Sequence, residues 1–544
     1  MYPKKRQNNK TAAEDILDYN FVNDLKESPI PASLDENRRI LKEMFNDCSD
    51  IVIRPFVIEK NIQALAVFID GLVISDVLDD ALRSLMILEG NESEIDRIVE
   101  TALPVSQIQT ADNYGELLLG ILGGDTGIFV ENHDRAILLG IRGPETRSVD
   151  EPSSESLVRG PREGFIENLR TNTALIRRKV KSPRLKMKPL VVGKHTNTNL
   201  VVSYIDGLAD PALIDEVVQR IELIDIDSVI ESGYIEEMIQ DSAYSPFPQM
   251  QYTERPDVVA SALLQGRVAI LVDGTPFALL APTIFLQLMQ AAEDYYERFQ
   301  IGTLLRWLRY LFLFMSLFTP ALYVAITTFH PEMIPTSLLL SVSAAREAIP
   351  FPAVIEALIM EIIFEALREA GVRLPKSVGS AVGILGAIVI GQAAVEAGIV
   401  SAPMVIVVSI TGIASFTIPH FNGAIAIRML RFPLLILASL FGIFGILLGT
   451  MIILGHMANL RSFGVPYLSP IGPTKWSDLK DALIRSPQWN LTTRPSFLGV
   501  QNPVRLGQEL PEEIKQNNGL KGQHISHPHA NNRQGGTQDD QGKE

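Results

Sequence analysis

The sequence predicts a multidomain α/β part followed by an all-α membrane part, and three observations support this fold class. The chain has 544 residues and is 47% apolar, but long apolar runs gather between residues 304 and 460. The residues before them alternate polar and apolar side chains as soluble proteins do, and two segments there resemble each other. The end of the chain is hydrophilic. We therefore expect two tandem related α/β subdomains, a bundle of about five transmembrane helices and a hydrophilic tail.

The expected domain boundaries follow these changes in composition. The start, MYPKKRQNNK, is positively charged, but no apolar run follows it. It is therefore not a secretory signal, and we expect the N-terminal region on the cytoplasmic side. The expected segments are a polar N-terminal extension (1–50), a first α/β subdomain (51–146), a basic connector (147–189), a second α/β subdomain (190–298), a transmembrane domain (299–460) and a hydrophilic C-terminal segment (461–544), disordered after about residue 508.

Two stretches of the α/β part share one order of predicted elements. AVFIDGLVISDVLDDALRSLM, with Asp70-Gly71, has a counterpart in VVSYIDGLADPALIDEVVQRI, with Asp206-Gly207. Each predicts a strand, a turn at Asp-Gly and an amphipathic helix. GELLLGILGGDTGIFVENHDRAILLG and VVASALLQGRVAILVDGTPFALLAP correspond in the same way. Any two α/β units would share some such strings, but we interpret the match as a duplication. Both aspartates are then turn residues rather than a catalytic pair.

Basic side chains gather in the connector between the two subdomains. Glu151-Pro152 and Gly160-Pro161 predict turns, and the stretch up to Lys179 is helical in character. Such a cluster either binds a phosphate, an anionic lipid head group or an acidic neighbouring surface, or forms a solvated helix face that pairs with the acidic subdomains. Charge alone favours the solvated face. The residues of this connector motif are Arg159, Arg162, Glu163, Arg170, Asn172, Arg177 and Arg178.

Five stretches have the length and apolarity of membrane spans, namely 310–329, 352–371, 378–400, 403–420 and 432–455. Five crossings would place the C-terminus outside. The Lys and Arg residues after the last stretch favour the inside instead. A sixth crossing by residues 334–349 would remove this conflict, although that helix would be short and strained.

Carboxylates interrupt the second of these stretches. At about 100° per residue, Glu361 and Glu365 lie on one stripe, and Glu356 lies about 140° away from Glu361. A charge at mid-bilayer costs about 3 kcal/mol or more, so these groups must face protein, water or a partner chain. They either line a polar passage or form a structural network neutralised by arginines. The candidates for a polar membrane passage are Glu356, Glu361, Glu365 and Glu396.

Composition and motifs exclude several other functions. The formal net charge of −15 makes the chain a poor nucleic-acid binder. Cys48 is the only cysteine, so neither an intrachain disulfide nor a cysteine zinc site is possible. The sequence contains no GxxxxGK[ST] loop, no HExxH and no GxSxG. We therefore expect no enzyme activity, no catalytic residues, no cofactor and no metal.

The connector also carries a resemblance. RSVDEPSSESLVRGPREGFIENLRTNTALIRRKVKSP resembles the signature of the A subunit of the GerA-type spore germination receptor family. Glu151-Pro152, the string VRGPREGF from Val158 and the string NLRTN from Asn168 carry the match. The similarity continues through the membrane region and covers roughly residues 50–490.

This resemblance implies a nutrient-responsive receptor subunit in the inner membrane of a bacterial spore. Family A subunits act with a transporter-like B subunit, the expected nutrient-binding component, and with a lipoprotein C subunit. They are expected to oligomerise into a ligand-gated ion channel that triggers germination. Three alternatives stay open: a non-conducting scaffold, an A-like paralogue that works with spore channel proteins, and a secondary transporter. The transporter requires an inverted repeat in the membrane part, for which the sequence gives no convincing sign.

Overall fold

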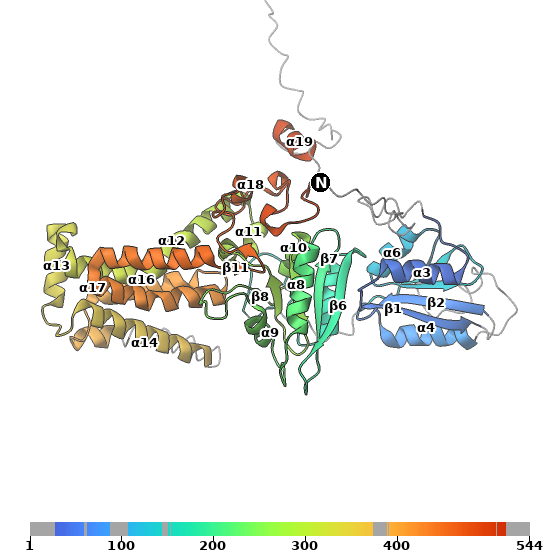
Figure 1. The fold of residues 1–544 in the computed structure, drawn as a ribbon, viewed down its shortest axis with the longest axis horizontal. Coiled ribbons are helices and arrows are strands. Elements are labelled where there is room, and N and C mark those ends of the chain that lie inside the picture. Colours follow the sequence, from blue (N-terminus) through green and yellow to red (C-terminus); the bar gives the residue numbers. More distant parts are fainter. Residues whose placement is uncertain are drawn as a thin grey trace, which may run out of the picture.

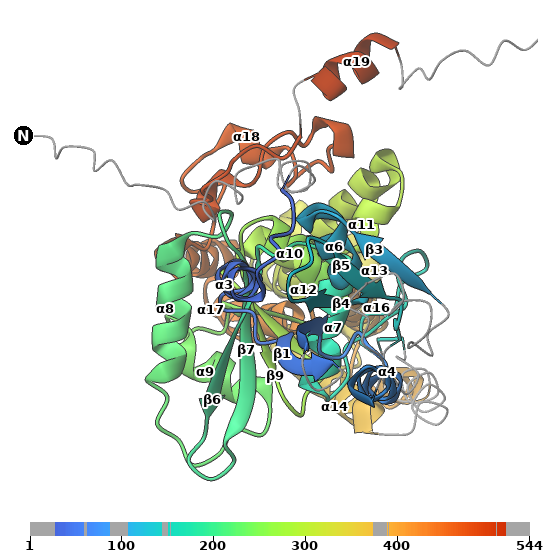
Figure 2. The same cartoon turned by 90° about the vertical axis from the view of Figure 1, so that its right-hand side faces the viewer.

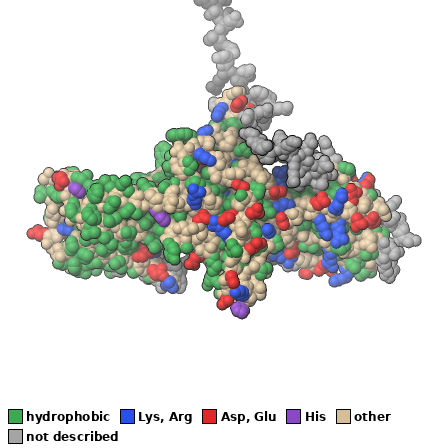
Figure 3. Space-filling model, viewed as in Figure 1, with side chains coloured by type: hydrophobic (Ala, Val, Ile, Leu, Met, Phe, Trp, Pro, Cys, Tyr) green, Lys and Arg blue, Asp and Glu red, His purple; other side chains and the backbone are tan. Residues whose placement is uncertain are grey.

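The structure is a computed structural model that describes residues 28–58, 62–87, 107–143, 151–152, 154–373, 389, 391–506 and 509–517. The molecule is elongated, with a helical bundle at one end, an α/β unit in the middle and another α/β unit at the other end (Figures 1 and 2). Apolar side chains cover most of the visible surface of the bundle, whereas charged side chains gather over the two α/β units (Figure 3).

The first α/β unit is a five-stranded antiparallel sheet with helices on it. Its strands pair in the order β1-β2-β4-β5-β3. Helix α3 lies in the predicted polar extension, yet Leu41 and Met44 are buried in the core of this unit. The elements are α3 (Leu34–Met44), β1 (Ile51–Ile58), β2 (Ile62–Ile69), α4 (Ser75–Ile87), β3 (Ile108–Ala111), α6 (Tyr114–Leu122), β4 (Thr126–Val130) and β5 (Ala136–Leu139).

The second α/β unit has the same strand order, β6-β7-β9-β10-β8, and its pairings are also antiparallel. Gly71 after β2 and Gly207 after β7 have positive φ angles of 85° and 74°. Residues other than glycine rarely adopt such angles, so both predicted Asp-Gly turns are present. Strand β6 begins at Leu185, inside the range predicted for the connector. The elements are β6 (Leu185–Val192), β7 (Thr198–Ile205), α8 (Pro211–Glu222), α9 (Ser232–Ile239), β8 (Gln251–Thr253), α10 (Pro256–Leu264), β9 (Val268–Val272) and β10 (Ala278–Ala281).

The two α/β units are joined directly as well as through the connector. Just before β1, Cys48 forms a parallel bridge with Met187 of β6. The Met187 amide donates to the Asp47 carbonyl at 2.8 Å, and the Ser49 amide donates to the Met187 carbonyl at 3.2 Å. The segment that precedes β1 therefore pairs with β6, at the edge of the second sheet.

A helical bundle follows the second unit. Two of its helices, α12 and α17, are long and apolar enough to cross a membrane, and α16 is apolar but shorter. The prediction of about five spans is not confirmed, and most of the span expected at 378–400 falls outside the described residues. The helices are α11 (Glu293–Tyr296), α12 (Phe299–Phe329), α13 (Thr336–Arg346), α14 (Ala353–Arg373), α16 (Ala402–Phe416) and α17 (Phe421–Asn459), with short 3-10 helices at Phe285–Met289 and Pro331–Met333.

Helix α17 is a hairpin of two antiparallel helices. Its backbone breaks at Gly442, which has φ 61° and ψ −140°. A Cβ on Gly449 would lie 3.0 Å from the side chain of Leu434, whereas 15 residues of straight helix would separate the two positions by about 22 Å. Both ends of α17 meet the second α/β unit, because His456 contacts Ser245 and Asn422 contacts the Met250 carbonyl. The predicted single span at 432–455 is therefore divided at its middle.

The C-terminal segment folds back onto the second α/β unit. The Ser462 hydroxyl donates to the Gln249 carbonyl at 2.6 Å, and the Tyr467 hydroxyl donates to the Pro248 carbonyl at 2.8 Å. This segment and the second unit must therefore lie on one side of any membrane that the bundle crosses. Its elements are β11 (Arg461–Ser462), β12 (Val465–Pro466), α18 (Trp476–Leu479), two 3-10 turns (Gln488–Asn490, Ser496–Leu498) and α19 (Glu509–Asn517).

The sequence predicts disorder after about residue 508, and the structure describes one helix there, α19. Leu510 and Ile514 are four positions apart and give the helix an apolar face, and Lys515 lies over the ring of Trp489. Residues 518–544 lie outside the described residues.

Candidate functional site in the bundle and connector

Glu356 is held at the end of the bundle far from the α/β units. Its side chain is fully buried, and Oε1 accepts a hydrogen bond from Arg346 Nε at 3.2 Å. The other oxygen, Oε2, accepts from the backbone amide of Ser401 at 2.9 Å. A carboxylate with both oxygens satisfied ties α13, α14 and the start of α16 together.

Glu361 forms a second buried ion pair one and a half turns further along α14. Its Oε2 lies 2.5 Å from Arg431 Nη1, and both side chains are 3% exposed. Arg431 also donates to the Ser316 hydroxyl at 3.1 Å. This contact joins α14, α17 and α12, so Glu361 has the surroundings of a structural residue.

Glu365 and Glu396 differ from these two because they are exposed. The side chain of Glu365 is 49% exposed and lies 3.3 Å from Arg368 and 3.8 Å from Arg428. Glu396 is exposed and accepts from the Gln392 amide at 2.8 Å. The four predicted passage residues therefore separate into two buried, paired carboxylates and two carboxylates on the surface of the bundle.

The connector residues are mostly structural. The Asn172 side chain accepts from the Ile166 amide at 2.9 Å and donates to the carbonyl of the same residue at 2.5 Å, which closes the loop before α7 (Leu169–Lys179). Arg170 forms an ion pair with Asp70 at the turn of the first unit. Arg177 is completely buried against Asp50. The prediction of a solvated helix face is therefore wrong for Arg177, because its guanidinium is buried in the protein interior.

The remaining basic residues of the connector motif face solvent. Arg178 lies 3.4 Å from Glu163, which also contacts Lys179 at 3.0 Å. Arg159 and Arg162 are exposed, and neither forms an ion pair with the part of the chain that the structure describes. Within the connector motif, these two side chains are therefore available to an anionic partner.

Sequence reasoning missed a buried charge cluster where α12 begins. Arg309 donates to Asp294 at 2.7 Å, and Arg485 of the C-terminal segment donates to the Asp294 carbonyl at 3.0 Å. The Tyr295 hydroxyl donates to Asp481 at 2.8 Å, and burial raises the pKa of that carboxyl. Arg309 was visible in the sequence as a charge that precedes a span, but its partners are distant in sequence, so only the fold reveals the cluster.

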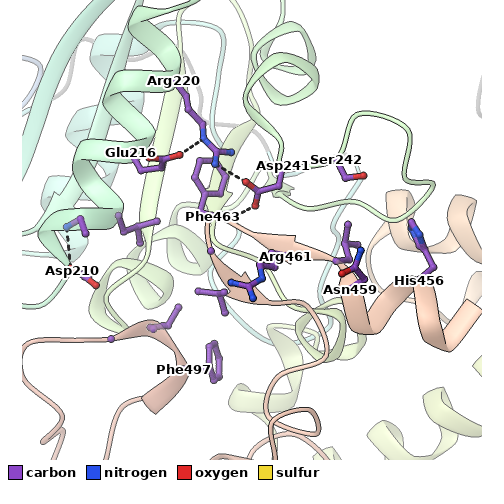
Figure 4. Close-up of a pocket in the computed structure, with 17 residues that line it drawn as sticks. Asp210, Glu216, Arg220, Asp241, Ser242, His456, Asn459, Arg461, Phe463 and Phe497 are labelled. Atoms are coloured by element: carbon purple, nitrogen blue, oxygen red, sulfur yellow. Dashed lines mark hydrogen bonds and ion pairs between the residues drawn. The ribbon is translucent and has the colours of Figure 1, made fainter.

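A cavity of about 800 Å³ separates the second α/β unit from the inner end of α17 (Figure 4). Arg220 of α8 donates to Glu216 at 2.7 Å and to Asp241 at 2.6 Å, and its guanidinium lies 4.7 Å from the centre of the Phe463 ring. Asp241 also accepts from the Phe463 amide at 2.5 Å. These contacts fix the chain that leaves the bundle to the second α/β unit.

The two α/β units share one topology, and the second contacts helix α17, which with α12 is long and apolar enough to cross a membrane. These features define a protein that combines an α/β body with a helical membrane-type domain. The chain belongs to the GerA family, because the family model described as Bacillus/Clostridium GerA spore germination protein matches residues 39–497. The predicted resemblance to the A subunits of this family is thus confirmed.

Similar proteins cover nearly the whole chain. It is 52% identical over 499 residues to the uncharacterized membrane protein YfkQ of Bacillus subtilis (strain 168), covering 91% of this chain and 97% of that protein. It is 46% identical over 502 residues to spore germination protein KA of the same organism, covering 91% and 92%. A solved structure also matches the chain, namely the crystal structure of the N-terminal domain of the A subunit of the Bacillus megaterium spore germinant receptor GerK3. The two sequences are 36% identical, the TM-score is 0.38, and the match covers 47% of this chain and 98% of that one.

Proposed function

We propose that the protein is the A subunit of a nutrient-responsive spore germination receptor and that it oligomerises into a ligand-gated ion channel. Membership of the family supports the receptor assignment. The observation that carries the channel assignment is the exposed polar face of α14 within an otherwise apolar bundle.

On that face, Glu365 and Glu369 remain 49% and 63% exposed. A charge that faces lipid costs about 3 kcal/mol or more, whereas one that faces water or another protomer does not. Large apolar side chains of α17 such as Phe444 and Met451 are exposed in the same bundle and suit lipid. An oligomer with the α14 faces toward its axis would remove the charges from lipid and line a polar passage with carboxylates, which favour cations.

The hairpin in α17 supports six crossings with both ends of the chain inside. We assign the crossings to α12, α14, the segment at 378–400, α16 and the two halves of α17. An even number fits the packing of Ser462 and Tyr467 on the second α/β unit. It also fits the basic residues after the last crossing, without the strained helix at 334–349. The α/β units then lie on the cytoplasmic side of the spore inner membrane.

The proposed partners are a transporter-like B subunit that binds the nutrient and a lipoprotein C subunit. The α/β units would receive the conformational change of a partner and pass it to the bundle. The hydrogen bond from the Tyr296 hydroxyl of α11 to Asp257 of α10 and the contact of Ser245 with His456 of α17 support this role, because they join the second unit to the bundle.

Ion flux through the purified chain in liposomes tests the proposal. Glu365→Gln and Glu396→Gln should assemble like the wild type and reduce cation flux several-fold, because each removes a carboxylate from the passage. Glu361→Gln should instead lose assembly, because it leaves Arg431 buried without a counter-charge. Glu43→Gln, on the exposed face of α3, is the matched control and should change neither property.

A non-conducting scaffold is the second candidate, and the buried pairs of Glu356 and Glu361 favour it because they are structural. A well-folded wild-type oligomer without cation flux, alone and with the B and C subunits, would support the scaffold. Unchanged flux in both Glu365→Gln and Glu396→Gln would refute the passage that we assign to them.

A further inference from the structure

A second cavity, of about 470 Å³, lies where the connector, the second α/β unit and the helical bundle meet. The connector contributes Glu155 and Leu157, and the second unit contributes Arg255 and Arg267. The bundle contributes His420, from the link between α16 and α17. Each of the three parts therefore places side chains around one space.

Arg267 is a buried cation without a counter-charge. The residue is 3% exposed, and its guanidinium donates to the Pro282 carbonyl at 2.8 Å, the Thr283 hydroxyl at 2.8 Å and the Gln251 side-chain carbonyl at 3.2 Å. All three acceptors are neutral, and Arg267 forms no ion pair with any carboxylate of the described ranges. Burial lowers the pKa of Arg267 to about 9. Such a group is costly unless an anion accompanies it.

The other buried cations at this cavity already have partners. Arg255 lies 3.1 Å from Asp257, and Arg309 lies 2.7 Å from Asp294. Arg505 also lines the cavity but is exposed to solvent. Of Arg255, Arg267 and Arg309, Arg267 is therefore the one without an ion pair to a described carboxylate. The carboxyl of Glu155 lines the same cavity, and burial raises its pKa to about 7, which favours its neutral form below that pH. In addition, Arg255 is 1% exposed and its Nε–H has no hydrogen-bond partner within the described structure, so a donor is also left over.

We propose that this cavity binds a small monocarboxylate, whose carboxylate pairs with the guanidinium of Arg267. A guanidinium and a carboxylate match in shape and form two parallel hydrogen bonds. A single unpaired cation selects a single negative charge, which disfavours a phosphate dianion. The phenol rings of Tyr295 and Tyr296 and the side chain of Leu157 line the same cavity and suit a short organic group on the carboxylate.

A ligand here would tie three parts of the molecule together. It would contact the second α/β unit at Arg267, the bundle at His420 and the connector at Leu157. Its binding would therefore stabilise one relative position of these parts against others. The site does not depend on whether the chain conducts ions, so its test is independent of the flux experiment.

Thermal unfolding of the full chain in nanodiscs, with acetate and phosphate as separate probes in a chloride buffer, tests this site. Acetate well above its Kd should raise the Tm of the wild type by about 2–4 °C relative to chloride at equal ionic strength. Phosphate should add nothing beyond chloride. Arg267→Gln should abolish the acetate shift, and Arg83→Gln, an exposed arginine of the first unit, should retain it.

Because Arg267→Gln can disturb folding, Gln251→Glu provides the decisive variant. The new carboxylate would replace the amide oxygen that now accepts from Arg267 at 3.2 Å and would supply the missing counter-charge within the chain. We expect a higher Tm without ligand and no acetate shift. An acetate shift that is equal in Gln251→Glu and wild type, a wild type that does not respond to acetate, or a response to phosphate alone would each overturn the proposal.

Discussion

Arg177 of the connector helix and Asp50 at the entry to the first sheet form a two-pronged ion pair that solvent does not reach. Arg177 Nε and Nη2 donate to the two carboxylate oxygens at 2.8 and 2.9 Å, and the side chains are 0% and 3% exposed. Arg177 Nη1 donates to the Ser182 carbonyl at 2.9 Å, just before β6. One guanidinium therefore connects the first α/β unit, the connector and the start of the second unit.

Arg177→Met should destabilise the protein by about 3–5 kcal/mol, because it leaves the Asp50 carboxylate buried without a partner. The measurement is chemical unfolding of the α/β part, monitored by circular dichroism in the far ultraviolet. The neighbouring Arg178→Met removes an exposed arginine and should cost less than about 1 kcal/mol.

The double variant Asp50→Leu with Arg177→Met distinguishes the free energy lost by breaking the ion pair from that lost through poorer packing. Replacing both charges by apolar groups should recover much of the lost stability, since neither charge of the pair then remains buried without its partner. Equal losses for Arg177→Met and Arg178→Met would show that the buried pair contributes no more than a surface contact.

The sequence predicted the tandem α/β units because apolar alternation and Asp-Gly turns are local signals. It also predicted the stripe of carboxylates on α14, since helix geometry follows from spacing. It could not separate Glu361 from Glu365. Their different burial depends on Arg431, which lies 70 positions from Glu361 in sequence and meets it only in the fold.

The hairpin in α17 was missed for a related reason. Phe432 to Gly455 is a long uncharged and mainly apolar run, and hydropathy counts such a run as one span. The break depends on the backbone of Gly442, in a region with several glycines, and no local pattern distinguishes it from Gly445 or Gly449. The buried cluster around Asp294 has partners nearly two hundred residues away, at Arg485.

The pH dependence of stability should reveal two buried carboxyls, one in the connector and one in the second unit. Burial raises the pKa of Glu155 to about 7, and it does the same for Glu236. The folded state then holds protons that the unfolded chain has released, so stability falls as pH rises from about 4.5 to about 7. Each group contributes at most about 1.4 kcal/mol per pH unit.

Glu155→Gln should make the protein less sensitive to pH, because the amide resembles the protonated carboxyl in shape but cannot ionise. Thermal unfolding between pH 5 and 8 measures the effect. The Tm of the variant should rise relative to the Tm of the wild type as pH rises. Glu163→Gln alters a half-exposed carboxylate and serves as control. A wild type whose Tm rises steadily across this range would contradict the assigned burial.

The turn of the α17 hairpin should depend on glycine at one position. Gly442 has φ 61° and ψ −140°, a region open almost only to glycine, and a Cβ there would lie 3.1 Å from His330 and Phe329 atoms. Gly442→Ala should therefore cost about 1–3 kcal/mol. Gly455→Ala is the matched control, because nothing lies within 4 Å of its Cβ position and alanine favours a helix. Similar Tm values for the two variants in detergent would argue against a strained turn at Gly442.

Cysteine labelling should show whether the chain crosses the membrane an even number of times. Arg83 of the first unit and Trp476 of the C-terminal segment are exposed, and so is Phe441 beside the hairpin turn. In sealed vesicles, an impermeant maleimide should label cysteines at 83 and 476 from one side and a cysteine at 441 from the other. The native Cys48 gives little background, because it is buried and burial raises the pKa of its thiol.

Each outcome of this labelling separates two arrangements of α17. A hairpin has its turn at 441–443 on the side opposite the α/β units, whereas one continuous span would carry 476 to that side and leave 441 within the membrane. Labelling of 83 and 476 from opposite sides would exclude six crossings, and it would also conflict with the hydrogen bonds from Ser462 and Tyr467 to the second unit. Labelling of 441 from the same side as 83 would place the hairpin outside the bilayer, and the exposed apolar side chains of α17 would then need a protein partner instead of lipid.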